Sequence, residues 1–288
     1  MAGGARVSLT GALRRTLIGE VRALFNDRAR GERPVERAAD PFIPQGSVAW
    51  RVHSDVTTMM VGGIAALLLQ MLHPSARAGV WDHSNFRRDM IGRLRRTARF
   101  IAVTTFGAKA DAEAAIARVR RIHEGVAGAR PDGTAYHAAD ARLLAWVHVA
   151  GALPFLDAWI RFGEPGMSRV DQDRYFADVA PVALALGADP VPTTRAEAEE
   201  LIASFRQDLT ADARSRDIAR AVLRARPRSL AAAPVQSLMM QAAIDLLPDR
   251  ARRMHGLHAT RLVRPAVSTA TLGVARTLRW AFQGPRGE

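Results

Sequence analysis

Apolar residues recur at helical spacing along almost the whole chain. Between residues 8 and 25, leucine and valine fall on one stripe of a helix whose opposite face is basic. Residues 46–72 are nearly continuously apolar, which is typical of a helix buried on most sides, and Pro74 ends or kinks that helix. Residues 85–106 predict a long helix that Gly107 closes.

Helical segments continue through the rest of the chain. Asp111 caps a helix that runs to about Val126, and Asp140 caps one that extends through His148. Further helices are predicted over residues 154–162, 168–186, 194–212, 215–225 and 234–247. No alternating run of apolar and polar residues is long enough to predict a strand. The pattern therefore predicts an all-α fold built on a single helical domain.

The same pattern divides the chain into three parts. Residues 1–40 hold the N-terminal amphipathic helix and a polar connector, residues 41–265 form the main domain, and residues 266–288 are a C-terminal tail. The N-terminal helix either docks on its own domain or binds a membrane surface or a partner. The tail likewise either packs on the core or contacts a membrane.

Composition narrows the function classes. Hydrophobic residues make up 48% and charged residues 24% of the chain, so wholesale disorder and fibrous repeats are excluded. The absence of cysteine excludes disulfides, thiolate zinc sites, iron–sulfur clusters and cysteine nucleophiles. The net charge of +13 would favour nucleic acid, but arginines are interleaved with acids over residues 195–226, and no nucleic-acid-binding signature occurs. We expect no nucleic-acid partner.

No segment is expected to cross a membrane. The longest apolar stretch, Met59–Leu72, falls short of the ~20 residues that a spanning helix needs. The N-terminus has no continuous apolar segment followed by a small-residue cleavage site, so a secretory signal is not expected. These observations predict a cytoplasmic protein and leave its oligomeric state open.

The residues that could carry chemistry are histidines and arginines, because the familiar hydrolase, phosphate-binding, paired-histidine metal and dinucleotide-binding motifs do not occur. His123 falls on the apolar stripe of its helix, while Arg93, Arg96 and Thr97 stand at i, i+3 and i+4 on one face of theirs. A haem would fit both patterns, since its iron takes an imidazole, its macrocycle fills an apolar slot and its propionates accept hydrogen bonds from arginine. The alternatives are an ordinary core histidine and arginines that face solvent.

Four blocks of the sequence resemble one enzyme family. The blocks are GGIAALLLQMLHPSARAGVWDHSNFRRDMIGRLRRTARFIAVTTFG, ARVRRIHEGVAG, GTAYHAADARLLAWVHVA and SLMMQAAIDLLPDRARRMHGL. Over about residues 41–265 the chain resembles the MpaB and rubber (latex-clearing) oxygenase family; the first three blocks are specific in order and spacing, and the fourth is diffuse. The resemblance implies a helical fold with a globin-like core, a bound haem b, and cleavage of carbon–carbon double bonds of isoprenoid chains with dioxygen.

The resemblance also implies roles for single residues. His123, in RIHEGV, matches the histidine that ligates the haem iron, and Arg93, Arg96 and Thr97, in GRLRRT, match basic and hydroxyl residues next to the haem. Latex-clearing enzymes have a lysine where this chain has Arg96, and a guanidinium cannot take a role that needs a deprotonated amine. Arg96 and Thr97 are the first candidates to stabilise negative charge on bound oxygen. The second ring nitrogen of His123 is expected to donate to a carbonyl or a carboxylate.

Two further histidines lie in blocks that the resemblance covers. His73, in LHP, and His83, in DHS, are the next candidates for a catalytic role beside the haem. Another shared block contains four residues that helix capping and packing explain equally well: Tyr136, Asp140, Trp146 and His148.

Together these observations predict a haem b-dependent oxygenase whose iron is bound by His123. Because latex-clearing enzymes are exported and this chain shows no signal peptide, the expected substrate is a small, apolar, unsaturated molecule inside the cell, with dioxygen as co-substrate. Two alternatives remain: a haem sensor or carrier without turnover, and a haem-free helical protein that binds lipids or a partner.

Overall fold

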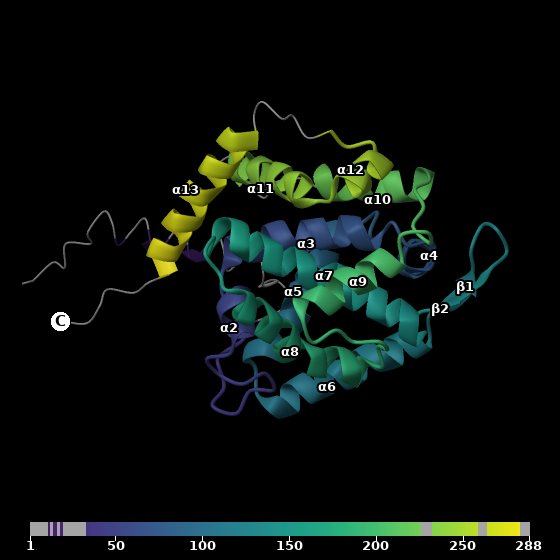
Figure 1. Cartoon of the computed structure of the whole chain (residues 1–288), viewed down its shortest axis with the longest axis horizontal. Coiled ribbons are helices and arrows are strands. Elements are labelled where there is room, and N and C mark those ends of the chain that lie inside the picture. The colour runs from purple at the N-terminus through teal and green to yellow at the C-terminus, as the bar shows by residue number, and fades with distance from the viewer. Residues whose placement is uncertain are drawn as a thin grey trace, which may run out of the picture.

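The structure is a computed structural model that describes residues 33–225, 232–258 and 264–282, together with residues 11, 14, 15, 18 and 19 near the N-terminus. Within these ranges the fold is all-α apart from one small hairpin, as the sequence pattern predicts (Figure 1). The elements are α2 (Val48–His53), α3 (Val56–Gln70), α4 (Pro74–His83), α5 (Met90–Phe106), α6 (Lys109–Glu124), β1 (Ala127–Ala129), β2 (Ala135–His137), α7 (Ala141–Phe162), α8 (Arg169–Leu186), α9 (Arg195–Ser204), α10 (Ala213–Leu223), α11 (Ala233–Leu246), α12 (Asp249–His255) and α13 (Arg264–Phe282).

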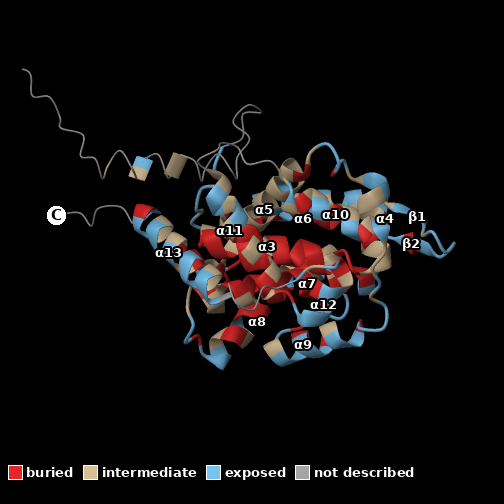
Figure 2. Ribbon diagram, turned by 90° about the horizontal axis from the view of Figure 1, so that it is seen from above, coloured by how far each residue is buried: buried red, intermediate tan, exposed pale blue. Residues whose placement is uncertain are grey.

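Helices α3 and α7 form the centre of the molecule, and most of their residues are buried (Figure 2). The two helices approach so closely at Gly62 that an added Cβ would lie 2.9 Å from the Cα of Phe155. At the other end of α3, Gln70 donates from Nε2 to the carbonyl of Val147 at 2.8 Å. These two contacts show that α3 and α7 run antiparallel.

Helix α7 differs from the sequence prediction at Pro154, which lies inside the helix. The sequence predicts separate helices on either side of residues 149–153, but a single helix continues through Pro154. A proline inside a helix removes one backbone hydrogen bond, and burial of this segment against α3 offsets that loss. The whole helix is long and apolar enough to cross a membrane by length and composition, although 61% of its most apolar window is buried inside the protein. By this test α7, and not the stretch Met59–Leu72, is the longest apolar segment; α3 and α4 also pass the test together, but they are bent by 104°.

Two other helix boundaries differ from the sequence prediction. The apolar segment 46–72 is divided into α2 and α3 because Asp55 caps a new helix, with its Oδ1 accepting from the backbone N–H of Thr58 at 2.9 Å. Similarly, Asp89 caps α5 by accepting from Gly92 at 2.8 Å, so this helix begins several residues later than predicted.

Helices α5 and α6 form an antiparallel hairpin joined only by Gly107 and Ala108. From this corner, His123 lies about 20 Å back along α6, and Arg93 lies about the same distance back along α5. The hairpin therefore brings His123 level with the first turns of α5, although the two segments belong to different sequence blocks.

The C-terminal segment packs on the core through α13. Arg279 donates from Nε to Oδ2 of Asp55 at 2.6 Å and from Nη2 to the carbonyl of Phe162 at 2.7 Å. These bonds join α13 to the start of α3 and the end of α7. The N-terminal helix predicted over residues 8–25 lies outside the described residues except at positions 11, 14, 15, 18 and 19. At one of these, Arg14 donates from Nη2 to the carbonyl of Trp280 in α13 at 3.0 Å, with its guanidinium 4.4 Å from the centroid of the Trp280 ring; the helix as a whole stays a prediction.

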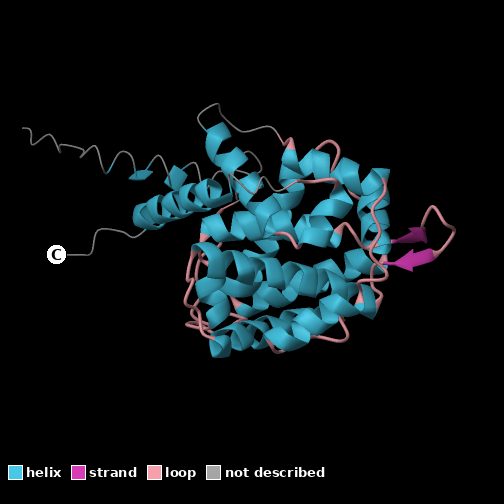
Figure 3. Cartoon of the chain, turned by 45° about the horizontal axis from the view of Figure 1, so that its top comes forward, coloured by secondary structure: helices cyan, strands magenta, loops and turns pink. Residues whose placement is uncertain are grey.

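The only strands among the described residues are β1 and β2, which pair antiparallel and extend from one side of the helical body (Figure 3). Three residues each, they were too short for the sequence pattern to predict. Tyr136 of β2 anchors the hairpin by donating to Oδ2 of Asp82 at 2.8 Å. The globin-like arrangement of the core that the resemblance implies stays a prediction.

Candidate functional site

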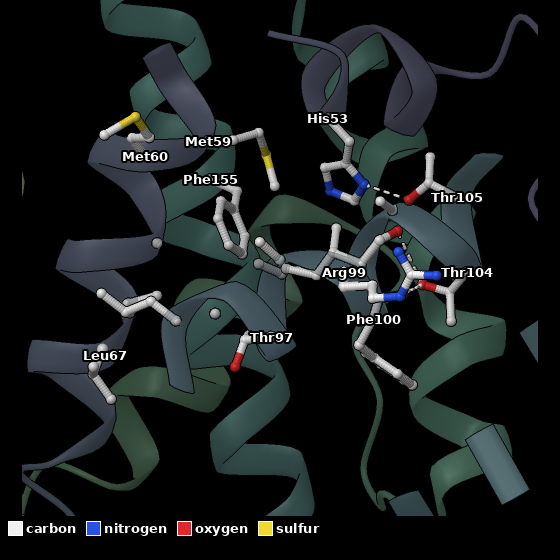
Figure 4. Close-up of a pocket in the computed structure, with 18 of the residues that line it drawn as sticks. His53, Met59, Met60, Leu67, Thr97, Arg99, Phe100, Thr104, Thr105 and Phe155 are labelled. Carbon is white, nitrogen blue, oxygen red and sulfur yellow. Dashed lines mark hydrogen bonds between the residues drawn. The ribbon is translucent and has the colours of Figure 1, made fainter. Parts of the chain in front are cut away.

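A cavity of about 550 Å³ lies between α3, α5, α6, α7 and α8. This volume falls within the range of ordinary ligand and cofactor sites. Its walls are mostly apolar, with leucine, methionine, phenylalanine and valine contributed by several helices. Figure 4 shows His53 and Thr105 toward one end of this central cavity and Leu67 and Thr97 toward the other.

The first end is formed by His53 of α2, Thr105 of α5 and Tyr175 of α8, and we call it the triad end. Nδ1 of His53 lies 2.8 Å from Oγ1 of Thr105, and its Nε2 lies 3.1 Å from the hydroxyl of Tyr175. Burial lowers the pKa of His53 to about 4, so the imidazole is neutral at pH 7. Burial, followed by the charges of Asp178 and Asp157, raises the pKa of Tyr175. The triad is therefore uncharged.

The opposite end contains Arg93, Thr97, His123 and His148, and we call it the two-histidine end. Thr97 lies eight residues before Thr105 on α5, or about 12 Å along the helix axis. His148 follows Val147, the residue that Gln70 contacts at the C-terminal end of α3. All four residues of this end line the cavity.

His123 lines the cavity as the sequence predicts for an interior histidine, and burial lowers its pKa. Its Nδ1 is buried and has no hydrogen-bond partner in the described part of the chain. The expected carbonyl or carboxylate partner for the second ring nitrogen is thus not present there. A neutral imidazole with a nitrogen left unpaired is available to a ligand from outside the chain.

His148 is a second histidine of the same kind, for which the sequence left capping and packing as an equally good explanation. Its Nε2 is buried without a partner among the described residues, and burial lowers its pKa to about 4. The signal in the sequence was its place in the block LLAWVHVA, but the apolar neighbours gave no reason to prefer a cavity over the core.

Arg93 brings a positive charge to this end. Burial, followed by the charge of Arg96, lowers its pKa to about 10, so the guanidinium remains charged at pH 7. It donates from Nη1 to Oγ of Ser84 at 3.2 Å, and no carboxylate of the described chain pairs with it. A partly buried cation without a counter-charge is costly, so this position favours an anionic group. Thr97 donates back to the carbonyl of Arg93 at 3.3 Å and leaves its oxygen able to accept.

Arg96 does not join them. Its side chain is 55% exposed, lies outside the cavity lining, and forms an ion pair with Asp89 at 3.4 Å. Positions i+3 and i+4 differ by about 100° around a helix, so a cavity that receives Arg93 and Thr97 can leave Arg96 in solvent. Arg93 and Thr97 therefore share the cavity wall, and Arg96 does not.

The other two histidine candidates also lie elsewhere. His73 packs against both Trp146 and Phe205, with its ring centroid 5.9 Å from each of theirs, and His83 donates from Nε2 to the carbonyl of Ala127 at 3.1 Å. Neither lines the central cavity, so the structure does not support placing them beside a haem. In the neighbouring block, helix capping describes Asp140, which caps α7 by accepting from Leu143 at 2.8 Å, whereas His148 lines the cavity.

No group of three or more histidine and carboxylate side chains in the described residues could hold a bare metal ion. A haem needs no such group, because the macrocycle supplies four nitrogens and the protein supplies the axial ligand. The unpaired nitrogens of His123 and His148, the charge of Arg93 and the apolar walls fit its iron, its propionates and its ring. The residues at this end are therefore compatible with a haem.

Comparison with known proteins identifies a family. The family model described as "ER-bound oxygenase mpaB/B'/Rubber oxygenase, catalytic domain" matches residues 50–280, well over half of the chain. No curated protein and no solved structure shows significant similarity to the chain. The matched range includes both ends of the cavity and extends into α13, beyond residue 265 where the sequence interpretation ends the domain.

Proposed function

The chain belongs to the catalytic-domain family of the ER-bound oxygenase mpaB/B' and rubber oxygenase, and from this premise we propose that it is a haem b-dependent oxygenase. Its substrate is a small apolar molecule with a carbon–carbon double bond, in the manner of an isoprenoid, and dioxygen is the co-substrate. The observation that carries the proposal is the pair of unpaired histidine nitrogens, on His123 and His148, at the same end of an apolar cavity.

His123 is the residue that we assign to the iron. It holds a neutral imidazole, because burial lowers its pKa, and only a neutral imidazole can ligate a metal. His148 is the second imidazole available at that end. Arg93 supplies the positive charge that would bind a propionate.

A haem bound here would supply the one-electron chemistry with dioxygen that amino-acid side chains lack. Thr97 presents a hydroxyl oxygen to the cavity, within hydrogen-bonding reach of its own helix at Arg93. We assign it the role of positioning a hydrogen-bonding partner near the reacting atoms. Arg96, exposed and paired with Asp89, takes no such role in this proposal, and neither do His73 and His83.

The apolar walls do two things for the reaction. They bind the hydrocarbon part of the substrate, and they partly desolvate Arg93 and His148, whose pKa values burial lowers, which strengthens the charge interactions of Arg93. A pocket of about 550 Å³ suits a small molecule, and this supports a monomeric substrate over a polymer.

The test is the ultraviolet–visible spectrum of the full chain, purified from cells supplied with a haem precursor, before and after dithionite and carbon monoxide. We expect a Soret band that moves on reduction and moves again with carbon monoxide. A folded protein that remains colourless after added haem contradicts the proposal and favours a haem-free binding protein.

A second measurement separates the oxygenase from a haem sensor or carrier. We expect the haem-loaded protein to consume dioxygen in the presence of unsaturated isoprenoids and to form carbonyl products, detected by mass spectrometry. A haem protein that binds the same molecules without oxygen uptake contradicts turnover.

A further inference from the structure

The triad end carries a hydrogen-bond donor that the protein itself does not use. The phenol of Tyr175, the hydroxyl of Thr105 and the neutral ring of His53 together hold three hydrogens on polar atoms. The two hydrogen bonds between these groups use two of them. One donor hydrogen is therefore left over in every arrangement of the triad.

The tautomer of His53 decides only where this hydrogen lies. If Nδ1 carries the ring proton, it donates to Thr105, Tyr175 donates to Nε2, and the hydroxyl hydrogen of Thr105 remains. If Nε2 carries the proton, it donates to Tyr175, Thr105 donates to Nδ1, and the hydroxyl hydrogen of Tyr175 remains. No other described residue accepts from Thr105 or Tyr175.

The unused donor hydrogen is buried at the wall of the cavity. Thr105 is 0% and Tyr175 is 1% exposed, and both belong to the cavity wall. A buried donor without an acceptor lowers stability, so the cavity favours an occupant that supplies one. The ring of Phe155, with its centroid 6.0 Å from that of His53, adds an apolar neighbour.

The charges near the triad favour a neutral acceptor over an anionic one. His53 is neutral at pH 7, because burial lowers its pKa to about 4. The negative charges of Asp178 and Asp157 also act on Tyr175 and would repel an anion. A neutral carbonyl oxygen, which only accepts, matches a single leftover donor better than a carboxylate does.

We propose that the triad of His53, Thr105 and Tyr175 is a subsite that binds a neutral carbonyl oxygen of the substrate. The substrate is then an apolar chain with a ketone or aldehyde group at one end. Taken with the proposed function, on which this consequence rests, the double bond that reacts lies well along the chain, because Thr97 is about 12 Å along α5 from Thr105.

The experiment compares two probes that differ by one group. Geranylacetone carries a ketone, and its matched hydrocarbon has a methylene in place of the carbonyl. Isothermal titration calorimetry on the full chain as purified, without turnover, measures the ratio of the two affinities. We expect the ketone to bind roughly tenfold more tightly.

Three variants test whether the hydroxyls of Thr105 and Tyr175 cause the preference for the ketone. The double variant Thr105→Val/Tyr175→Phe removes both hydroxyls and leaves the ring N–H of His53 facing a methyl group or a phenyl ring, so we expect the ratio to fall to about one. The single variants Thr105→Val and Tyr175→Phe are measured beside it, and at least one of them lowers the ratio. These single variants keep the test decisive where the double variant fails to fold.

Thr104→Val is the matched control. Thr104 also lines the cavity, but its hydroxyl donates to the carbonyl of Phe100 at 2.9 Å and has no hydrogen to spare. We expect this variant to keep the wild-type ratio. Thr104 thus differs from Thr105 in hydrogen bonding and not in residue type.

Equal binding of the two probes by the wild type, no binding of either probe, or an unchanged ratio in the folded hydroxyl variants would each overturn the proposal. These outcomes are distinct from failure of the proposed function, which appears as the absence of a Soret band. A colourless protein that still selects the ketone would keep the subsite and lose the oxygenase.

Discussion

Both ends of the central cavity contain histidine, but the hydrogen bonding of the imidazole nitrogens differs between them. At the triad end both ring nitrogens of His53 are hydrogen-bonded, to Thr105 and Tyr175. At the two-histidine end, His123 and His148 each bury a ring nitrogen that has no partner in the described residues. An imidazole with both ring nitrogens hydrogen-bonded holds its neighbours in position. An imidazole with an unpaired ring nitrogen is available to bind a ligand. Residue type and burial are nearly the same at the two ends, so hydrogen bonding is what separates their roles.

Removing His123 is the change with the largest expected effect on this comparison. His123→Gly is expected to weaken haem binding by more than about 100-fold, because an axial ligand contributes more than the outer partners whose loss costs 10–100-fold. Haem titration followed at the Soret band measures it. Added imidazole should restore the band, and His83→Gly, at an exposed histidine outside the cavity, should leave the affinity unchanged. If His148→Gly loses haem while His123→Gly keeps it, the two histidines exchange roles.

The burial of His53 at the triad end can be tested by measuring how the free energy of unfolding changes as the pH falls. The unfolded chain protonates His53 near its ordinary pKa of 6.5, but burial lowers the pKa in the folded chain to about 4. Stability that is present above pH 6.5 is therefore lost as the pH falls toward 4, by at most about 3 kcal/mol from this residue. Urea unfolding across this range should show a shallower loss for His53→Phe than for the wild type. Equal slopes for the two proteins would mean that His53 does not titrate as a buried group.

The helices that frame both ends meet at Gly62. An alanine there would place its Cβ 2.9 Å from backbone atoms of Phe155 and Pro154, so Gly62→Ala is expected to destabilise the fold by about 2 kcal/mol. At Gly63 an added Cβ would lie 3.5 Å from the ring of Phe155, which is ordinary contact. Gly63→Ala is the matched control and should change the urea midpoint little, or raise it through helix propensity. Equal losses at the two positions would contradict the close approach of α3 and α7.

The smallest effects are expected for replacing Arg93 and Arg96, which lie three residues apart on α5. Arg93→Ala should weaken haem binding about tenfold, because it removes the partly buried charge that would face a propionate. Arg96→Ala should change haem affinity less than twofold and stability by less than about 0.5 kcal/mol, because its ion pair with Asp89 is exposed. Haem titration and urea unfolding of both variants test this. A larger effect from Arg96 than from Arg93 would contradict their placement.

Local features of the fold could be predicted from the sequence because neighbouring residues determine them. The 3.6-residue period identified the helices, and side chains such as Asp140 and Ser168 capped α7 and α8 as expected. The spacing of Arg93, Arg96 and Thr97 placed all three on one face of a helix, and in the structure Arg93, Thr97 and His123 line the cavity while Arg96 does not. The resemblance to the oxygenase family is confirmed by the family match.

Only the tertiary structure decided which distant segments meet. His53 finds its partners 52 and 122 residues away, and His148 reaches the cavity because α7 packs antiparallel to α3 and places Val147 beside Gln70. Arg96 faces solvent because the cavity takes the neighbouring face of α5. Helix period and capping involve residues within a few positions of each other, whereas these outcomes depend on how the helices pack together. The sequence by itself therefore determined the helices and the family, and packing determined which side chains share the site.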